Sequence, residues 1–482
     1  MPRTVVPQES GADRAAAASI GDRLDRMPIT STHRQLTAVV GVGLLFDTFE
    51  NNLAGTISKV LQNDFAFDGT TLKLVLASAF VGQFIGSLTL GRVADRYGRR
   101  RAFLVNLAIY SGFSLLAAFS PNAGWLIVTR FLAGIGIGAE QTLSDCYLAD
   151  VLPASKRGRY TAWAYTIAFC GVPAVGFAAM WLVPLSPLGI DGWRWLFVIG
   201  SFGSLVVWFL RRRLIESPRW LAANGRVEEA DLLVAGMESG ATGGGRPLSA
   251  PAPSAHGSAP APVRPEQPRP RLRDVFGRHY RRRTAMLWTF SILSVFGYYG
   301  FGALAPQILA AKGYDVVTGL GFIALSFLGY PIGSALSLPL IDRYERRTLV
   351  GVVAAAMVAT GTAFAYADSA ALVVASGFCY TLCSNVFSNV SHVYLAEQYP
   401  TAFRATASGA AYSLSKLSAA ALPFILLPVL DAHGPGMLFL VIGAAMTLLA
   451  ATVLLLGERT TGTSVDGGAE AGTVRADTSR LP

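Results

Sequence analysis

The chain contains the same local sequence twice, half a chain apart. The pattern Asp-Arg-Tyr-X-Arg-Arg begins at Asp95 and begins again at Asp342, a shift of 247 positions. The same shift carries Tyr147-Leu-Ala onto Tyr394-Leu-Ala, and it carries Asp68 onto Asp315. Three matches at one shift indicate a tandem duplication, and its repeat unit is about half of the 482 residues.

The composition indicates that this repeat lies in a membrane. Of the residues, 52% are hydrophobic and only 15% are charged, and apolar runs long enough to cross a bilayer as a helix recur twelve times. We therefore expect an all-α membrane protein whose twelve transmembrane helices form two six-helix bundles related by the internal repeat. The predicted parts are an N-terminal tail (1–35), a first bundle (36–211), a linker with a disordered middle (212–283), a second bundle (284–457) and a disordered C-terminal tail (458–482).

Positive charges alternate from loop to loop. The formal net charge is +10; arginines follow the second, fourth and eighth spans, whereas the loops after the third, ninth and eleventh contain no Lys or Arg. By the positive-inside rule, the termini, the linker and the basic loops are expected to be cytoplasmic, with the chain crossing the cell membrane many times. The basic excess then reflects topology and contact with anionic lipid, so we expect membrane lipid and no nucleic acid as a partner.

Other classes of protein are poorly supported by the sequence. All four cysteines lie within predicted spans, and Cys379 and Cys383, one helical turn apart, have no third metal ligand nearby. The five histidines are scattered, with only His392 in a span, which disfavours a membrane-embedded enzyme. We expect no metal, no cofactor and no enzymatic activity, and a chain that acts as a monomer.

Four charged residues inside the predicted spans are candidates for proton coupling. Charges in the hydrocarbon cost at least a few kcal/mol, so they are functional candidates. Asp47 and Glu50 lie one turn apart on one face of the first span, and Arg130 in the fourth span can pair with either carboxylate. Glu140, ten residues after Arg130, is the next candidate. A purely structural ion pair is the alternative interpretation.

Three motifs carry a family resemblance. The loop from Gly91 to Arg101, the run Arg130-Phe-Leu-Ala-Gly-Ile-Gly-Ile-Gly and the segment Glu216-Ser-Pro-Arg-Trp-Leu together resemble the major facilitator superfamily, including its sugar and organic-acid branches. The resemblance covers the chain except its tails and the middle of the linker. It implies a secondary transporter of a small-molecule substrate, with two six-helix bundles that open a central cavity alternately to each side of the membrane.

The loop beginning at Gly91 is also a predicted conformational latch. An aspartate at a helix end can accept hydrogen bonds from backbone N–H groups and arginines, while the glycines permit close approach. In the second copy Leu338 and Glu345 replace the two glycines, so that latch is degraded. The alternative is that the arginines only anchor the topology. The predicted latch residues are Gly91, Asp95, Arg96, Gly98 and Arg99 in the first copy and Asp342, Arg343 and Arg346 in the second.

The predicted substrate is an organic or aromatic acid carried together with protons. The pattern from Phe46 to Glu50 is similar to aromatic-acid and metabolite:proton symporters, and Lys416 in the eleventh span suits a carboxylate. The seventh span has Tyr298 and Tyr299 and lacks the paired glutamines of sugar porters. The tenth span adds a polar face made of Asn385, Asn389 and His392. A sugar:proton symporter and a drug or metabolite efflux antiporter are the alternatives.

Overall fold

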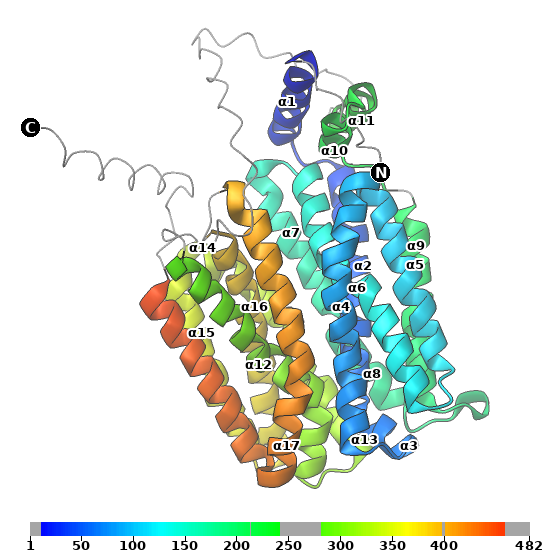
Figure 1. Ribbon diagram of the computed structural model, residues 1–482, viewed down its shortest axis with the longest axis vertical. Helices are drawn as coiled ribbons and strands as arrows, with labels where there is room; N and C mark the ends of the chain where they lie inside the picture. The colour runs from blue at the N-terminus through cyan, green and yellow to red at the C-terminus, as the bar shows by residue number, and fades with distance from the viewer. Residues whose placement is uncertain (1–10, 213, 242–280, 398–400, 458–482) are drawn as a thin grey trace, which may run out of the picture.

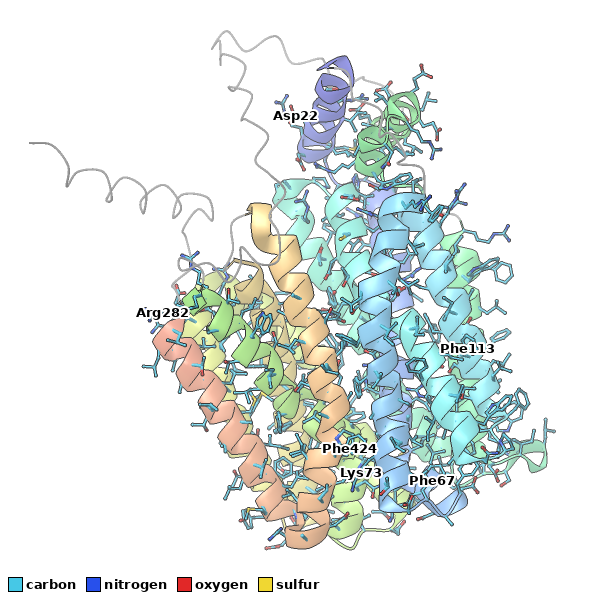
Figure 2. The ribbon with its side chains drawn as sticks, viewed as in Figure 1. Asp22, Phe67, Lys73, Phe113, Arg282 and Phe424 are labelled. Carbon is cyan, nitrogen blue, oxygen red and sulfur yellow. The ribbon has the colours of Figure 1, made fainter. Side chains whose placement is uncertain are left out.

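The protein is a bundle of helices in two halves. The computed structural model describes residues 11–212, 214–241, 281–397 and 401–457, and this part of the chain is helical with no strand. The two halves stand side by side, with blue and cyan helices in one and green to red helices in the other (Figure 1). Asp22 and Arg282 lie at one end of the bundle, called here the α1 face, and Phe67 and Lys73 lie at the opposite face (Figure 2).

The first half is built from residues 11–241. Its helices are α1 (Gly11–Arg26), α2 (Ser31–Thr56), α3 (Ser58–Asp64), α4 (Gly69–Tyr97), α5 (Arg99–Ala118), α6 (Ala123–Val151), α7 (Ala154–Phe169), α8 (Gly171–Leu182), the short 3-10 turn η1 (Pro187–Gly189), α9 (Gly192–Arg211), α10 (Pro218–Ala223) and α11 (Val227–Ala241).

The second half begins at residue 281. Its helices are α12 (Arg281–Ala311), α13 (Val316–Phe327), α14 (Gly329–Arg343), α15 (Arg346–Ala365), α16 (Ala370–Glu397) and α17 (Thr401–Leu456). Helix α17 bends at Gly434, whose φ of 75° is a backbone conformation that favours glycine, and the bend separates the two last predicted spans.

Ten segments of the described chain are long and apolar enough to cross a membrane. One of them, Ala410–Leu456, has 47 residues and is long enough for two crossings. Helix α2, with 26 residues, carries Asp47 and Glu50 and supplies the remaining span of the twelve that the sequence predicts. Large apolar side chains such as those of Phe202, 66% exposed, and Leu455, 71% exposed, lie on the surface of the bundle, as lipid contact requires.

Two of the predicted spans are each broken into two helices. The fifth predicted span is divided into α7 and α8 at Gly171, where a Cβ atom would clash with the Leu45 carbonyl of α2. The eighth is divided into α13 and α14 at Gly329, where a Cβ would clash with α16 at Thr381. Glycine thus allows close approach of neighbouring helices at both breaks, and α7 and α8 pack against α14 and α13 across the two halves.

Small residues bring the two halves together near the opposite face. A Cβ on Gly55, near the end of α2, would lie 2.9 Å from the Ala303 Cα of α12. A Cβ on Gly176 of α8 would lie 2.9 Å from the Ala324 Cα of α13. Both gaps are smaller than a methyl group needs, so the halves are in backbone contact at this end.

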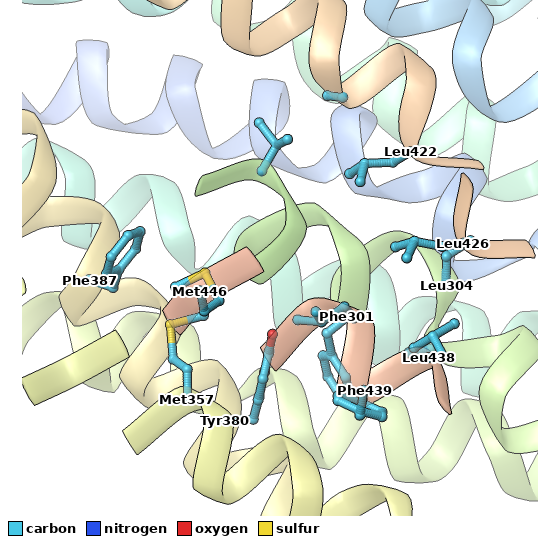
Figure 3. Close-up of a cluster of buried hydrophobic side chains, with 14 of the residues drawn as sticks. Phe301, Leu304, Met357, Tyr380, Phe387, Leu422, Leu426, Leu438, Phe439 and Met446 are labelled. Atoms are coloured by element: carbon cyan, nitrogen blue, oxygen red, sulfur yellow. The ribbon is translucent and has the colours of Figure 1, made fainter. Parts of the chain in front are cut away.

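The core of the second half is apolar and aromatic. Phe301 of α12 packs against Tyr380 and Phe439, with ring centroids 4.9 and 6.4 Å away (Figure 3). The Tyr380 hydroxyl donates to the Gly297 carbonyl at 2.7 Å, so its polar atom is satisfied inside this cluster. The cluster holds α12, α15, α16 and the end of α17 as one body.

Helices α1, α10 and α11 form a small unit on the α1 face. Their buried apolar side chains meet in one cluster. Arg23 of α1 pairs with Glu238 at 2.8 Å and also with Asp231, both on α11, and the two carboxylates raise the pKa of Arg23. Asp25 accepts from Arg219 at 2.8 Å. The sequence predicts only a tail at residues 1–35, because α1 is too polar to be recognised as an apolar run.

The repeat is visible in how two equivalent helices begin. Asp68 caps α4 by accepting from the Thr71 amide at 2.8 Å, and Asp315 caps α13 by accepting from the Thr318 amide at 3.0 Å. Hydrogen bonds from the threonine side chain and amide lower the pKa of each aspartate. The Asp68 and Asp315 match found in the sequence therefore marks a helix start that occurs in both halves.

Candidate functional site

Glu50 and Arg130 form a buried ion pair inside the first half. Arg130 Nη1 lies 3.5 Å from Glu50 Oε2, and the side chains are 1% and 0% exposed. Ser114 of α5 donates to the same oxygen at 2.6 Å, and Arg130 Nη2 donates to the Glu50 carbonyl at 3.2 Å. Gly200 of α9 leaves the space that Glu50 fills. Of the two carboxylates open to Arg130 in the sequence, the structure pairs it with Glu50.

A second buried ion pair joins Glu140 of α6 to Arg211, the last residue of α9. Arg211 Nη1 lies 2.5 Å from Glu140 Oε1, and both side chains are 0% exposed. The Arg211 guanidinium lies over the Phe103 ring at 4.3 Å, and the missing side chain of Gly43 makes room for it. Arg211 is not among the residues predicted from the sequence, because three consecutive arginines at the end of a span resemble a topological anchor.

Asp47 is the third buried acid of the first half. It is 9% exposed, and its Oδ1 has no hydrogen-bond partner among the described residues. The charges that act on it belong to Glu140, Lys416, Arg211 and Glu50. Asp47 therefore lies between the two ion pairs and also within electrostatic range of the second half.

Lys416 of α17 is surrounded by aromatic rings. Its Nζ donates to the Tyr299 hydroxyl at 3.2 Å and lies 4.8 Å from the centre of the Tyr412 ring. Tyr299 packs edge-to-face against Tyr298 at 4.8 Å, and Tyr298 packs against Tyr330 at 5.8 Å. Lys416 is only 5% exposed, and among the described residues no carboxylate forms an ion pair with it. A buried ammonium without an acidic partner is an unusual feature of a membrane-spanning helix.

Side chains of the first half complete this aromatic cluster. Phe80 of α4 packs edge-to-face against Tyr299 at 4.9 Å. The Tyr412 hydroxyl donates to Gln141 of α6 at 2.7 Å, and Ser87 lies 3.2 Å from Ser413. Lys416 and its rings thus lie where the two halves meet. Phe80 and Gln141 were not predicted, because neither residue is distinctive in its local sequence.

The three polar residues predicted on the tenth span have different surroundings. Asn385 is fully buried and donates to the Tyr330 carbonyl, so it ties α16 to α14 and is covered in this conformation. Asn389 donates to Ser334 and Ser337 of α14 at 3.2 and 2.8 Å. His392 is exposed, and the charge of Lys416 acts on it. Of the three, His392 is exposed, Asn389 is half-buried and Asn385 is buried.

The predicted latch is described in part. Gly91, Asp95 and Asp342 lie in helices, but their side chains fall outside the described residues. Gly98 ends α4 with a φ of 99°, and the next two amides, of Arg99 and Arg100, donate to Glu216 Oε1 at 2.9 and 3.2 Å. Glu216 therefore caps α5. The latch side chains that the structure describes as exposed are Arg96 and Arg343, and those it describes as half-buried are Arg99 and Arg346.

These features define the chain as a membrane transporter. Helices with outward apolar side chains enclose buried charges, and two repeated halves meet around polar and aromatic side chains. The sequence pattern of the Major Facilitator Superfamily matches residues 40–423 and 317–479, so the chain belongs to that superfamily. It is a multi-pass membrane protein, and the expected all-α fold of two six-helix bundles is confirmed.

Known proteins of similar sequence are transporters too. The chain is 27% identical to the niacin transporter NiaP of Acinetobacter baylyi, over 92% of this chain and 98% of that protein. It is 27% identical to a gallate transporter of Pseudomonas putida, over 81% and 84% of the two chains. The structure of the Escherichia coli xylose transporter XylE, in a partially occluded inward-open conformation, superposes with a TM-score of 0.72, over 90% of this chain and all of that one, at 20% identity. The chain is a transporter and not an enzyme.

Proposed function

We propose that the protein carries a small aromatic or other organic acid across the cell membrane together with protons. The observation that carries this proposal is Lys416, a buried ammonium that has tyrosines around it and no acidic partner among the described residues. A ligand carboxylate would supply the missing charge, and a flat apolar body would pack on the rings of Tyr298, Tyr299 and Tyr412. Asn389 and His392 stay candidate contacts.

The relatives support the same substrate class. Niacin and gallate, the compounds in the names of two relatives, are both small aromatic carboxylates. The similarity to the xylose transporter structure is at 20% sequence identity, so it supports the fold and not the substrate. A sugar symporter therefore becomes an outcome of the binding experiment, and an efflux antiporter stays the second alternative.

We expect the purified protein to bind an aromatic carboxylate and to ignore its neutral amide. The pairs to compare are benzoate with benzamide and nicotinate with nicotinamide, because each pair differs only in the group that meets Lys416. The acid should raise the thermal unfolding midpoint with increasing concentration, since a ligand that binds the folded state stabilises it. Equal shifts for acid and amide would contradict the proposal, and a shift by xylose alone would favour the sugar symporter.

Proton coupling is assigned to the Glu50–Arg130 pair. The deprotonated carboxylate can pair with Arg130, whereas protonation releases Arg130 and changes the attraction between α2 and α6. The two states of one pair can thereby bias the alternation between conformations. The backbone contacts at Gly55 and Gly176 then belong to a conformation that is closed at the opposite face. The central cavity would open alternately to the α1 face and to the opposite face.

The α1 face is assigned to the cytoplasm because the basic loops lie there. Residue 243 lies in the linker, outside the described residues, and is a suitable reporter. Gly243→Cys, in a chain without its four native cysteines, should resist a membrane-impermeant thiol reagent added to intact cells. It should be labelled once the cells are opened. Labelling in intact cells would reverse the assignment.

A further inference from the structure

Several buried polar groups inside the first half lack partners, and they gather around the Glu140–Arg211 pair. Apart from the two atoms that form the ion pair, the side chains of Glu140 and Arg211 have no hydrogen-bond partner among the described residues; the atoms concerned are Glu140 Oε2, Arg211 Nε and Arg211 Nη2. The same holds for both side-chain polar atoms of Asn106 and for the Ser144 hydroxyl, and both residues are 0% exposed. Buried polar groups are costly to leave unsatisfied, and buried water is the usual partner where protein groups are missing.

The packing brings these groups to neighbouring turns of α6, on either side of Glu140. Ser144 lies one turn after Glu140 on α6. Asn106 lies one turn after Phe103, over which Arg211 stacks, and its carbonyl is 2.8 Å from where a Cβ on Gly136 would be. Gly136 is one turn before Glu140. Asn106, Ser144 and the Glu140–Arg211 pair therefore surround one buried region between α5, α6 and α9.

Three carboxylates lie at successive levels along this half. Arg211 packs against Gly43, Asp47 follows one turn later on α2, and Glu50 follows almost one turn after that. At a rise of about 1.5 Å per residue, Asp47 is about 6 Å along the axis from Gly43, and Glu50 is about 10 Å from it. Asp47 Oδ1 has no hydrogen-bond partner among the described residues, and Glu140 and Glu50 both act on its charge. Asp47 therefore lies between the level of the Glu140–Arg211 pair and the level of Glu50 along α2.

We propose that Asp47, the Glu140–Arg211 pair and water held by Asn106 and Ser144 form a proton path inside the first half, leading from Glu50 toward the α1 face. This inference rests on the proposed coupling at Glu50. A proton leaves Glu50, which pairs again with Arg130, and it is taken up by the Asp47 carboxylate. Glu140 takes it next and releases Arg211. When the proton passes to water toward the α1 face, the Glu140–Arg211 pair forms again.

The groups that face Glu140 permit these steps. Arg211 approaches from α9, Asp47 from α2 and Tyr110 from α5, while Arg130 lies ten residues earlier on α6 itself. From α4 the neighbour is Gln83, whose backbone packs at Gly138 and which cannot titrate. From the second half, the charge of Lys416 acts on Asp47. The path thus runs beside the proposed substrate site without passing through it, which makes the two separable by mutation.

The test uses the whole protein in proteoliposomes with benzoate or nicotinate. The double variant Glu140→Gln/Arg211→Met removes both charges together and leaves no unpaired buried ion. Asn106→Leu, of similar size, removes the polar atoms expected to hold water. Asp64→Asn is the matched control, because it also replaces a carboxylate but lies in α3, where it accepts from Trp193 at 3.1 Å.

We expect accumulation driven by a pH gradient to fall by at least about tenfold in the double variant. It should fall several-fold in Asn106→Leu and stay at the parent level in Asp64→Asn. Exchange of labelled for unlabelled substrate, which moves no net proton, should stay within about twofold of the parent in all three. Parental accumulation in the double variant overturns the path. Loss of exchange overturns it as well, because a route for protons alone is not needed for exchange.

Glu50→Gln in the same assay separates this inference from the proposed function. If Glu50→Gln loses accumulation while the double variant keeps it, coupling at Glu50 stands and the path fails. If Glu50→Gln keeps accumulation, the proposed coupling fails, and the path fails with it.

Discussion

Glu50→Gln is expected to abolish substrate accumulation against its gradient while leaving substrate exchange intact. Glu50 is fully buried between Ser114 and Arg130, and glutamine keeps its size and its ability to accept both hydrogen bonds. Glutamine cannot carry a proton, however, so an imposed pH difference no longer does work on the substrate. Accumulation in proteoliposomes should fall to the level of passive equilibration, a loss of at least about tenfold.

Asp47→Asn tests the other acid of helix α2 in the same assay. Asp47 stands between Glu50 and Glu140 in the proposed path, and asparagine cannot carry a proton, so Asp47→Asn should lower accumulation as Glu50→Gln does. Asp64→Asn, outside the buried acids, should behave as the parent does. If both α2 variants still accumulate substrate under a pH difference, helix α2 does not carry the proton.

Lys416→Met is expected to weaken binding of aromatic carboxylates by about thirtyfold or more. Removing one member of a buried, hydrogen-bonded charge pair costs about 2–5 kcal/mol, and each 1.4 kcal/mol is a factor of ten in affinity. Binding of the neutral amide should change little, so the measurement is the ratio of the two affinities in parent and variant. Lys416→Arg, which keeps the charge, should retain the preference for the acid.

The stability of the Lys416 variant provides a control. Methionine replaces a buried cation that has no acidic partner among the described residues, so the unfolding midpoint should not fall. A loss of acid binding at an unchanged midpoint then comes from the lost charge. An unchanged preference for acid over amide in Lys416→Met would contradict the proposed substrate class.

The sequence predicts much of this fold because its strongest signals are local. Apolar runs indicate the spans, and the shift from Asp95 to Asp342 indicates two halves. The breaks at Gly171 and Gly329 were not predicted, because they depend on which helix packs against each glycine. Helix α1 was missed because it is stabilised by contacts with α10 and α11 some two hundred residues away.

In the candidate site, too, local signals could be predicted from the sequence and contacts between distant segments could not. Charges inside spans are conspicuous in a sequence, so Asp47, Glu50, Arg130 and Glu140 could be singled out, but their partners could not. Arg211 lies at the end of a span, where arginine is ordinary, and only the packing brings it to Glu140. An acid in a span without a visible cation is the signal that would have prompted a search for one. Phe80 contacts Tyr299, and Gln141 contacts Tyr412, across the two halves. No local sequence pattern predicts these contacts.

The unit of α1, α10 and α11 has a mechanical consequence. Arg219 of this unit meets the Asp150 carbonyl of α6 at 3.2 Å, and Asp25 accepts from Arg157 of α7 at 3.4 Å. It should therefore travel with the first half as a rigid attachment. The unit and the first bundle then move as one body, and the two halves are expected to rotate about the contact surface between the two bundles.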